Sequence, residues 1–243
     1  MNENPHISRA FDRDLEAIEA MIMKMGGQVE EAIGRATEAM SNGDADLAER
    51  VRLGDRSIDV AEQRVNEEAA RVIALRQPIA SDLRTVLTVF RISAALERIG
   101  DYSKNIAKRT EILAELHPVD GANPSLKRMA RSVQAMLKDA LDAYIQRDAE
   151  LAADVRARDE EIDQMYNGLF RQLLTHMMED PRNITACMHL HFIAKNVERM
   201  GDLVTGVAEQ VIYRVTGDLP DDDRIKADFT ATSQAGMIAP GSV

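Results

Sequence analysis

Apolar residues recur every three or four positions along most of the chain, with charged and polar residues between them. This spacing places the apolar side chains on one stripe of an α-helix, whereas a half-buried strand requires strict alternation. Six amphipathic helices are therefore predicted, at residues 7–40, 45–75, 78–116, 125–146, 149–178 and 181–216. The abundance of Ala, Leu, Glu, Arg and Met also favours helices over strands.

Turn-forming residues interrupt this pattern where helices are expected to begin or end. Asp44 follows a Ser-Asn-Gly turn and is placed to cap the second helix, and Pro78 and Pro181 fit the first turn of the helices that they open. The longest interruption, residues 117–124, contains two prolines and a glycine. It is predicted to separate two halves of the chain.

Three glycines lie inside the first predicted helix, at Gly26, Gly27 and Gly34. Each weakens a helix by up to about 1 kcal/mol relative to alanine. Two explanations are open for them: a second helix packs closely on this side, or the helix bends here.

The two halves repeat each other in sequence. Residues 44–52 (DADLAERVR) match residues 148–156 (DAELAADVR), and residues 96–101 (LERIGD) match residues 197–202 (VERMGD). A repeat of this length is too long for a solenoid unit. We therefore predict an all-α fold of two tandem antiparallel three-helix bundles related by internal duplication. The predicted bundles span residues 7–117 and 124–217, and residues 218–243 are predicted to form a flexible tail.

The balance of charge excludes several classes of partner. The chain has 41 acidic and 30 basic side chains and a formal net charge of -11, which disfavours binding to nucleic acid or anionic lipid. Cys187 is the only cysteine, so no intrachain disulfide can form, as expected in a reducing compartment. No apolar run approaches the roughly 20 residues that span a bilayer, and no signal-peptide pattern is present. We expect a soluble cytoplasmic protein without membrane insertion.

Pairs of acidic residues four positions apart occur on the second and third predicted helices of each half, and this spacing places both carboxylates on one helical face. Crowded carboxylates repel one another, and a bound multivalent cation relieves that repulsion. Oxygen ligands suit magnesium and manganese and also accept iron or zinc. The predicted site is open and lies at the surface. The candidate metal ligands are Asp55, Asp59, Glu97 and Asp101 in the first half, and Asp159, Asp163, Glu198 and Asp202 in the second.

The ordinary alternative is a solvated acidic face without a ligand. In that case Arg98, Lys104 or Lys108 would pair with the first set of acids, and Arg199 with the second. The survival of Glu-Arg-x-Gly-Asp in both copies favours the functional interpretation. No phosphate-binding glycine loop and no nucleophile arrangement is found, so no catalytic residue and no organic cofactor site is predicted.

Taken together, these motifs resemble those of the PhoU family of phosphate-transport accessory proteins. Each half carries D-x-x-I-D on its second helix and E-R-(I/M)-G-D on its third, and the segments 76–84, 11–15 and 25–27 are also similar to the family. The similarity extends over residues 7–216. It implies a cytoplasmic regulator, often a homodimer, without a catalytic step. It further implies negative regulation of the phosphate-starvation response, by linking the ATPase subunit of the phosphate transporter to a sensor histidine kinase.

The resemblance also implies metal binding, with iron, zinc or a similar ion held by Glu97 and Asp101 and by Glu198 and Asp202; the aspartate pairs of the second helices are our addition to this set. One alternative from another class stays open, a metal-dependent enzyme built on a carboxylate-bearing bundle. The two sites are not identical, because Asn105 in the first half is replaced by Gly206 in the second.

Overall fold

The computed structural model describes residues 5–119 and 121–220, and all regular elements in these ranges are helical. The all-α prediction is therefore confirmed. Of the predicted tail, residues 221–243 lie outside the described part. The first half contains α1 (Pro5–Asn42), α2 (Ala45–Gly54), α3 (Arg56–Arg76) and α4 (Ser81–Leu113). The second contains α5 (Ala122–Gln146), α6 (Ala149–Ala157), α7 (Asp159–Glu179), the 3₁₀ turn η1 (Pro181–Asn183) and α8 (Ile184–Thr216).

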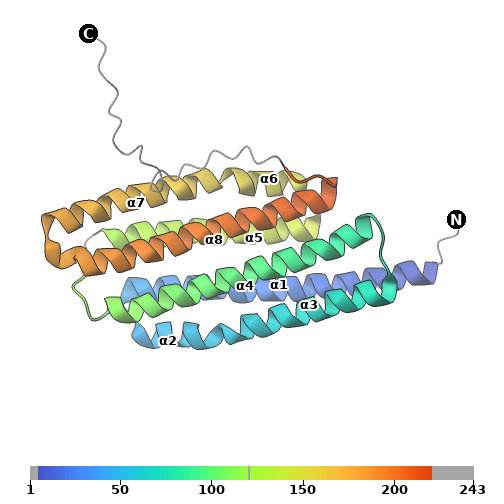
Figure 1. The fold of residues 1–243 in the computed structure, drawn as a ribbon, viewed down its shortest axis with the longest axis horizontal. Coiled ribbons are helices and arrows are strands. Elements are labelled where there is room, and N and C mark those ends of the chain that lie inside the picture. The colour runs from blue at the N-terminus through green and yellow to red at the C-terminus, as the bar shows by residue number, and fades with distance from the viewer. Residues whose placement is uncertain (1–4, 120, 221–243) are drawn as a thin grey trace, which may run out of the picture.

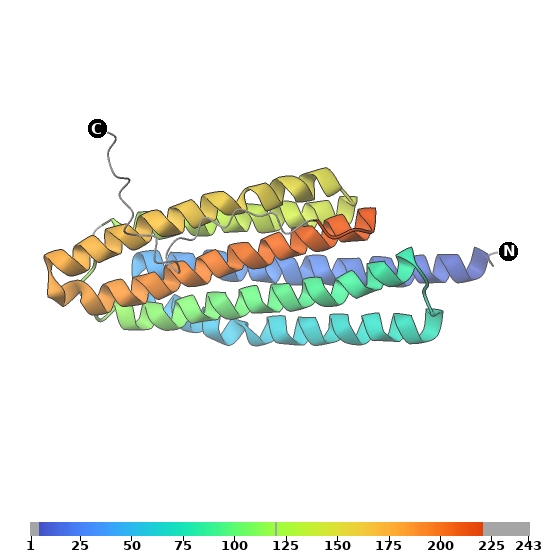
Figure 2. The ribbon, with the colours of Figure 1, turned by 45° about the horizontal axis from the view of Figure 1, so that its top comes forward.

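The two halves are elongated antiparallel bundles that lie side by side (Figure 1). The long helices α1, α4, α5 and α8 form the centre, with α4 packed against α8 and α1 against α5. The α2–α3 arm covers α1 and α4, and the α6–α7 arm covers α5 and α8, as the turned view also shows (Figure 2). The predicted apolar stripes face this shared interior, where residues such as Ile22, Leu96 and Val204 are fully buried. None of the described helices is both long and apolar enough to cross a bilayer.

The second helix of each half is broken, which the hydrophobic pattern did not predict. In the first half the break separates α2 from α3 at Asp55. There the Ile58 amide donates to the Asp55 carbonyl at 2.8 Å, and the Ser57 hydroxyl donates to the Gly54 carbonyl at 2.7 Å. A serine hydroxyl that bonds to nearby backbone competes with the helical ladder in this way. The second half breaks at the corresponding place, between α6 and α7.

The helix starts agree in part with the predictions. Asp44 caps α2 by accepting a hydrogen bond from the Leu47 amide at 2.8 Å, and Asp148 caps α6 in the same way. The third helix of each half begins later than predicted. The α4 helix begins at Ser81, after a residue with positive φ, and a separate 3₁₀ turn precedes α8.

Close helix packing explains two of the three glycines in α1. A Cβ atom on Gly26 would lie 2.3 Å from Leu141 Cδ1 of α5. At Gly34 the nearest atom is Gln134 Nε2 of α5, at 3.1 Å. No such contact exists at Gly27, where nothing lies within 4 Å of the position of a Cβ atom. The glycines at positions 26 and 34 therefore allow α1 and α5 to approach each other.

Contacts between α4 and α8 fix how the two halves are placed along the bundle. Arg109 of α4 contacts His189 of α8 at 3.3 Å, and Arg91 donates a hydrogen bond to Gln210 at 3.4 Å. These pairs align the two helices in antiparallel register. Residues 97–101 of α4 consequently lie at the same height as residues 198–202 of α8.

Candidate cation site in each half

Gly100 allows α3 to pack directly on the backbone of α4. A Cβ atom at this position would lie 2.9 Å from Ile58 Cδ1 and 3.7 Å from Asp55 Oδ1. Gly100 stands between Glu97 and Asp101 in sequence, so the Asp55 carboxylate lies beside the stretch of α4 that carries both acids. The D-x-x-I-D motif of α3 and the E-R-x-G-D motif of α4 are therefore in contact with each other.

The second half repeats this contact. A Cβ atom on Gly201 would lie 3.3 Å from Ile162 Cγ2 and 3.6 Å from Asp159 Oδ1. Asp159 therefore lies beside the stretch of α8 that carries Glu198 and Asp202. The structure thus brings Asp55 and Asp159 beside the acids of the third helix of their halves, which sequence reasoning left open because the relative height of the helices was unknown.

The acids of the first half influence one another's protonation. The pKa of Asp59 is raised above its usual value, mainly by burial and next by the negative charge of Asp55. Asp101 raises it further, whereas Lys104 lowers it. A cluster of this kind holds more negative charge than its surroundings stabilise.

The pKa of Glu97 is raised for the same reasons. Burial is the largest cause, followed by the negative charge of Asp101. The remaining contributions come from Glu62, Asp59 and Asp55, so all four predicted acids of this half act on one another. We call Asp55, Asp59, Glu62, Glu97 and Asp101 the first acidic cluster.

Glu62 is the member that sequence reasoning missed. Its carboxylate accepts a hydrogen bond from Asn66 Nδ2 at 3.2 Å, and Asn66 in turn accepts from the Ser93 hydroxyl of α4 at 3.0 Å. Glu62 lies seven residues after Asp55, on the same helical face, and that spacing was the available signal. The internal repeat did not point to Glu62, because the corresponding residue of the second half is Tyr166.

Lys104 supplies a positive charge inside the first acidic cluster. Its ammonium donates a hydrogen bond to Asp55 Oδ2 and a longer one, at 3.3 Å, to Asp101 Oδ1. The hydrogen bond to Asp55 is also the main cause that raises the pKa of Lys104. Pairing with Lys104, one element of the ordinary alternative, is therefore present. Within the described ranges, neither Arg98 nor Lys108 forms an ion pair with the cluster.

In the second half, the lysine that pairs with the acids precedes the E-R-x-G-D motif in sequence instead of following it. Lys195 Nζ lies 2.8 Å from Glu198 Oε1 and 4.9 Å from the centre of the Tyr166 ring. Lys195 precedes its glutamate by one turn, whereas Lys104 follows Asp101 by one turn. We call Asp159, Asp163, Glu198 and Asp202 the second acidic cluster. Arg199, the predicted partner, is exposed and makes no ion pair with any residue that the structure describes.

Both clusters are more buried than the predicted open site. Asp55, Asp163 and Glu198 are buried, and Asp101 is the acid with a half-exposed side chain. The reason is the close approach of the helices at Gly100 and Gly201, which sequence alone did not reveal.

The residues fit a hard cation in chemistry and charge. Carboxylate oxygens are the preferred donors for such ions, and in the first acidic cluster five carboxylates face one lysine. Their side chains are not converged: among the described residues, no group of three or more His, Cys, Asp or Glu side chains is arranged to hold a metal ion. A cation in the first cluster would have to separate Lys104 from Asp55 and Asp101.

Comparison with known proteins places this arrangement in context. A family model of the PhoU domain matches residues 22–110 and 126–211, one segment in each half. The phosphate-specific transport system accessory protein PhoU homolog of Rhizobium meliloti is 45% identical over 227 residues, which cover 93% of this chain and 96% of the relative. The accessory protein PhoU of Escherichia coli is 40% identical over 218 residues, covering 89% and 90%.

Solved structures show the same architecture. The crystal structure of PhoU from Pseudomonas aeruginosa superimposes with a TM-score of 0.83 at 36% sequence identity, covering 86% of this chain and all of that chain. PhoU from Streptococcus pneumoniae, described as a phosphate transport system regulatory protein, gives a TM-score of 0.81 at 30% identity. The duplicated bundle is thus shared with both solved proteins.

Proposed function

Because the chain belongs to the PhoU family, we propose that it is a cytoplasmic accessory protein that regulates phosphate-specific transport without catalysing a reaction itself. The observation that carries this proposal is the match of both halves to the family, since the relatives named as transport accessory proteins align over nearly the whole chain. A match confined to one half would have left the other half to serve a different purpose.

The finer role that we propose is negative regulation of the phosphate-starvation response. In this role the protein, as a homodimer, contacts the ATPase subunit of the phosphate transporter and a sensor histidine kinase. The support for this is the resemblance to the family and the description of the solved relative from Streptococcus pneumoniae as a regulatory protein.

We further propose that each half holds a cation. Glu97 and Asp101 with Asp55 and Asp59 would hold it in the first half. In the second half the ligands are Glu198, Asp202, Asp159 and Asp163. Such an ion neutralises crowded carboxylates, and iron, zinc, manganese and magnesium are the candidates. The raised pKa values of Asp59 and Glu97 support this proposal, because burial and, after it, neighbouring carboxylates disfavour their charged forms, which a bound cation would stabilise.

Elemental analysis tests the cation proposal. The wild-type protein is purified without chelators or metal-affinity steps and compared with the variant E97Q/D101N/E198Q/D202N. We expect about one or more metal ions per half in the wild type, and loss of the metal from the variant without loss of helical circular dichroism. A control with the same change in charge replaces four exposed glutamates by glutamine, none of which forms an ion pair with a residue that the structure describes: Glu16, Glu38, Glu67 and Glu161. An equal loss of metal from that control would contradict the proposal.

A strain that lacks the gene tests the regulatory role. In phosphate-rich medium the strain should express a phosphate-starvation reporter, and the wild-type chain should silence it. Co-precipitation from the complemented strain should recover the transporter ATPase subunit or the sensor kinase. Turnover of a phosphoester or redox substrate by the metal-loaded protein, abolished in the quadruple variant, would instead establish the enzyme alternative.

A further inference from the structure

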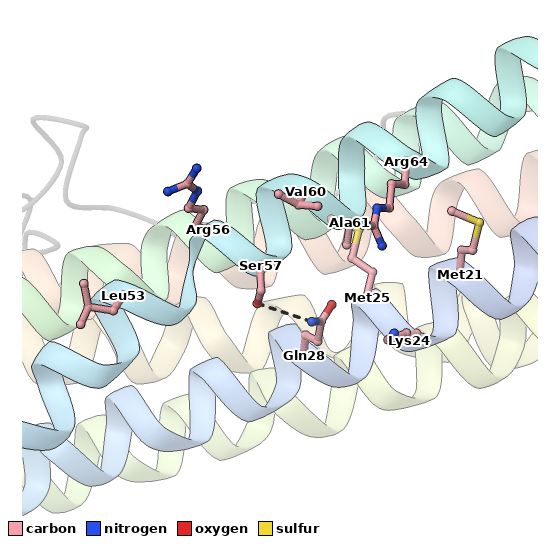
Figure 3. A pocket seen from close by; sticks show the side chains of 10 residues that line it. All are labelled: Met21, Lys24, Met25, Gln28, Leu53, Arg56, Ser57, Val60, Ala61 and Arg64. Carbon is pink, nitrogen blue, oxygen red and sulfur yellow. Dashed lines mark hydrogen bonds between the residues drawn. The ribbon is translucent and has the colours of Figure 1, made fainter.

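A groove lies between α1 and the α2–α3 arm, on a different side of α3 from the first acidic cluster. Its volume is about 560 Å³. Its floor is apolar, formed by Met25 and Ala61, and Met21 and Val60 extend this apolar lining (Figure 3). Leu53, at the end of α2, also lines it with 72% of its surface exposed. Exposed apolar side chains around a hollow are typical of interaction sites.

The charged residues that line the groove are all basic. They are Lys24 of α1 and Arg56 and Arg64 of α3, and each side chain is exposed. Within the described residues none of the three forms an ion pair. The chain as a whole carries a net charge of -11, so three uncompensated cations around one groove contrast with the rest of the composition.

The groove continues toward the end of α1 as a second hollow of about 150 Å³. Gln28 and Ser57 line both hollows, and a hydrogen bond of 3.4 Å from Gln28 Nε2 to Ser57 Oγ crosses between them (Figure 3). Beyond this bond Arg50 adds a further positive charge, whereas Arg35 is paired with Glu31 at 2.6 Å in the same hollow. From Met21 to Arg35 the two hollows extend roughly 20 Å along α1, the length of a helix of about 14 residues.

The spacing of the basic residues distinguishes between possible ligands. Arg56 and Arg64 are eight residues apart on one helix, which separates their positions by about 12 Å. A helical ligand meets both side chains where they stand, whereas a single phosphate or other small anion would require them to turn toward each other (Figure 3). Nucleic acid is disfavoured by the overall negative charge, and a helical surface offers no free backbone edge to an added strand.

We infer that this groove is the docking site for an acidic amphipathic helix of a partner protein. Aliphatic side chains of the partner pack on Met21, Val60 and Ala61, beneath which Met25 is fully buried, and its carboxylates pair with Lys24, Arg56 and Arg64. Methionine adapts its shape to such ligands, and helix-in-groove recognition uses apolar anchors spaced three and four residues apart. Charge complementarity with these unpaired cations selects an acidic partner.

A peptide selection tests this inference without assuming the identity of the partner. A phage-displayed library of random peptides of about 16 residues, slightly longer than the groove, is selected against the full-length wild-type protein. The enriched peptides are synthesised, and their affinity is measured by fluorescence anisotropy for the wild type and for R56E/R64E. We expect acidic sequences with aliphatic residues at helical spacing. Their binding should weaken about tenfold or more in the variant and should also weaken with added salt.

Two further variants complete the design. The control R131E/R171E makes the same change in charge at exposed arginines of α5 and α7 that form no ion pair within the described part of the chain, and it should keep wild-type affinity. L53S removes an exposed apolar contact and should also weaken binding. All variants should melt at the wild-type temperature, because the substituted side chains are exposed.

Several results would overturn the inference. They are enrichment of peptides that are not acidic, or equal affinity of the enriched peptides for R56E/R64E and for the wild type. A selection on the wild type that enriches peptides no more than a selection on R56E/R64E would also overturn it. Sedimentation measurements test one more possibility, that a second copy of the chain occupies the groove. If R56E/R64E changes the oligomeric state of the protein, a second copy of the chain occupies the groove, and the inferred partner is wrong.

Discussion

Lys104 of α4 forms a hydrogen bond to the buried carboxylate of Asp55, across the contact between α3 and α4. This lysine compensates part of the negative charge of the first acidic cluster. The corresponding residue of the second half is Thr205, whose hydroxyl donates to the Gly201 carbonyl at 3.0 Å. The two halves therefore share four acids but differ in how the charge of those acids is balanced.

Replacing Lys104 by methionine should strengthen cation binding in the first half. A cation in the wild type has to displace the ammonium from Asp55 and Asp101, and the variant removes that competition. Without added cation, K104M should lower the free energy of unfolding by about 1–2 kcal/mol, because the buried Asp55 loses its partner. Urea unfolding across a manganese titration measures both effects. The control K108M changes an exposed lysine of the same helix and should behave as wild type; unchanged or weaker manganese binding by K104M would contradict this prediction.

Neutralising Asp59 or Glu97 should stabilise the cation-free protein near neutral pH. The pKa of each is raised by burial and by neighbouring carboxylates, so the folded state binds protons more tightly than the unfolded state. The free energy of unfolding then falls as pH rises through the range just above the usual carboxyl pKa. D59N and E97Q should each gain about 0.5 kcal/mol at neutral pH. The gain should disappear at pH values where both states are protonated.

Chemical unfolding in chelator-treated buffer at several pH values measures this dependence. E67Q, at an exposed position of α3, is the control and should change stability little at any pH. A loss of stability at neutral pH in D59N or E97Q would show that these carboxylates make favourable contacts that outweigh their repulsion.

Adjacent glycines of α1 should respond to alanine in opposite directions. Gly27 is exposed with open space beside it, so G27A should raise the free energy of unfolding by about 0.5–1 kcal/mol through better helix propensity. At Gly26 the new methyl group would overlap the side chain of Leu141, which is itself buried. Overpacking of this kind costs about 1–3 kcal/mol, so G26A should be destabilised. Thermal and urea unfolding compare the pair, and equal stabilisation of both would show that α5 moves aside freely.

Arg214 should be the most sensitive charged residue tested outside the acidic clusters. Its guanidinium, 2% exposed, pairs with Glu19 of α1, donates to the Tyr144 carbonyl of α5 at 3.2 Å and lies 4.6 Å from the Tyr144 ring centre. Burial in this region raises the pKa of Tyr144 to about 12. R214M should cost about 3 kcal/mol, because it leaves Glu19 without its partner. E19Q should cost less, since a neutral amide still accepts a hydrogen bond. Urea unfolding ranks the two, and the reverse order would contradict this account.

Particular residues show how far the sequence alone determined the fold and the site. The apolar stripes and the repeated E-R-x-G-D motif were sufficient for the duplicated bundle, because helical periodicity and internal repetition are local properties. The break at Asp55 was not predictable from periodicity, since the stripe continues across it. Lys104 was named only as one of several possible partners, and Glu62 was missed. Those assignments depend on how α3 is placed against α4, which the contact at Gly100 fixes. The groove beside Met25 depends in the same way on the distance between two helices.

Because both copies of the bundle lie in one polypeptide, the two acidic clusters can be substituted independently of each other. In an assembly of identical subunits, every substitution would occur at both positions at once. Here lysine stands at position 104 where the other half has threonine, at position 205, and lysine stands at position 195 where the first half has alanine, at position 94. Under the proposed cation binding, the two clusters would therefore differ in their preference for ions. If both clusters hold a cation as proposed, a single molecule with two unlike clusters at equal height along α4 and α8 would respond to two concentration ranges of the same ion.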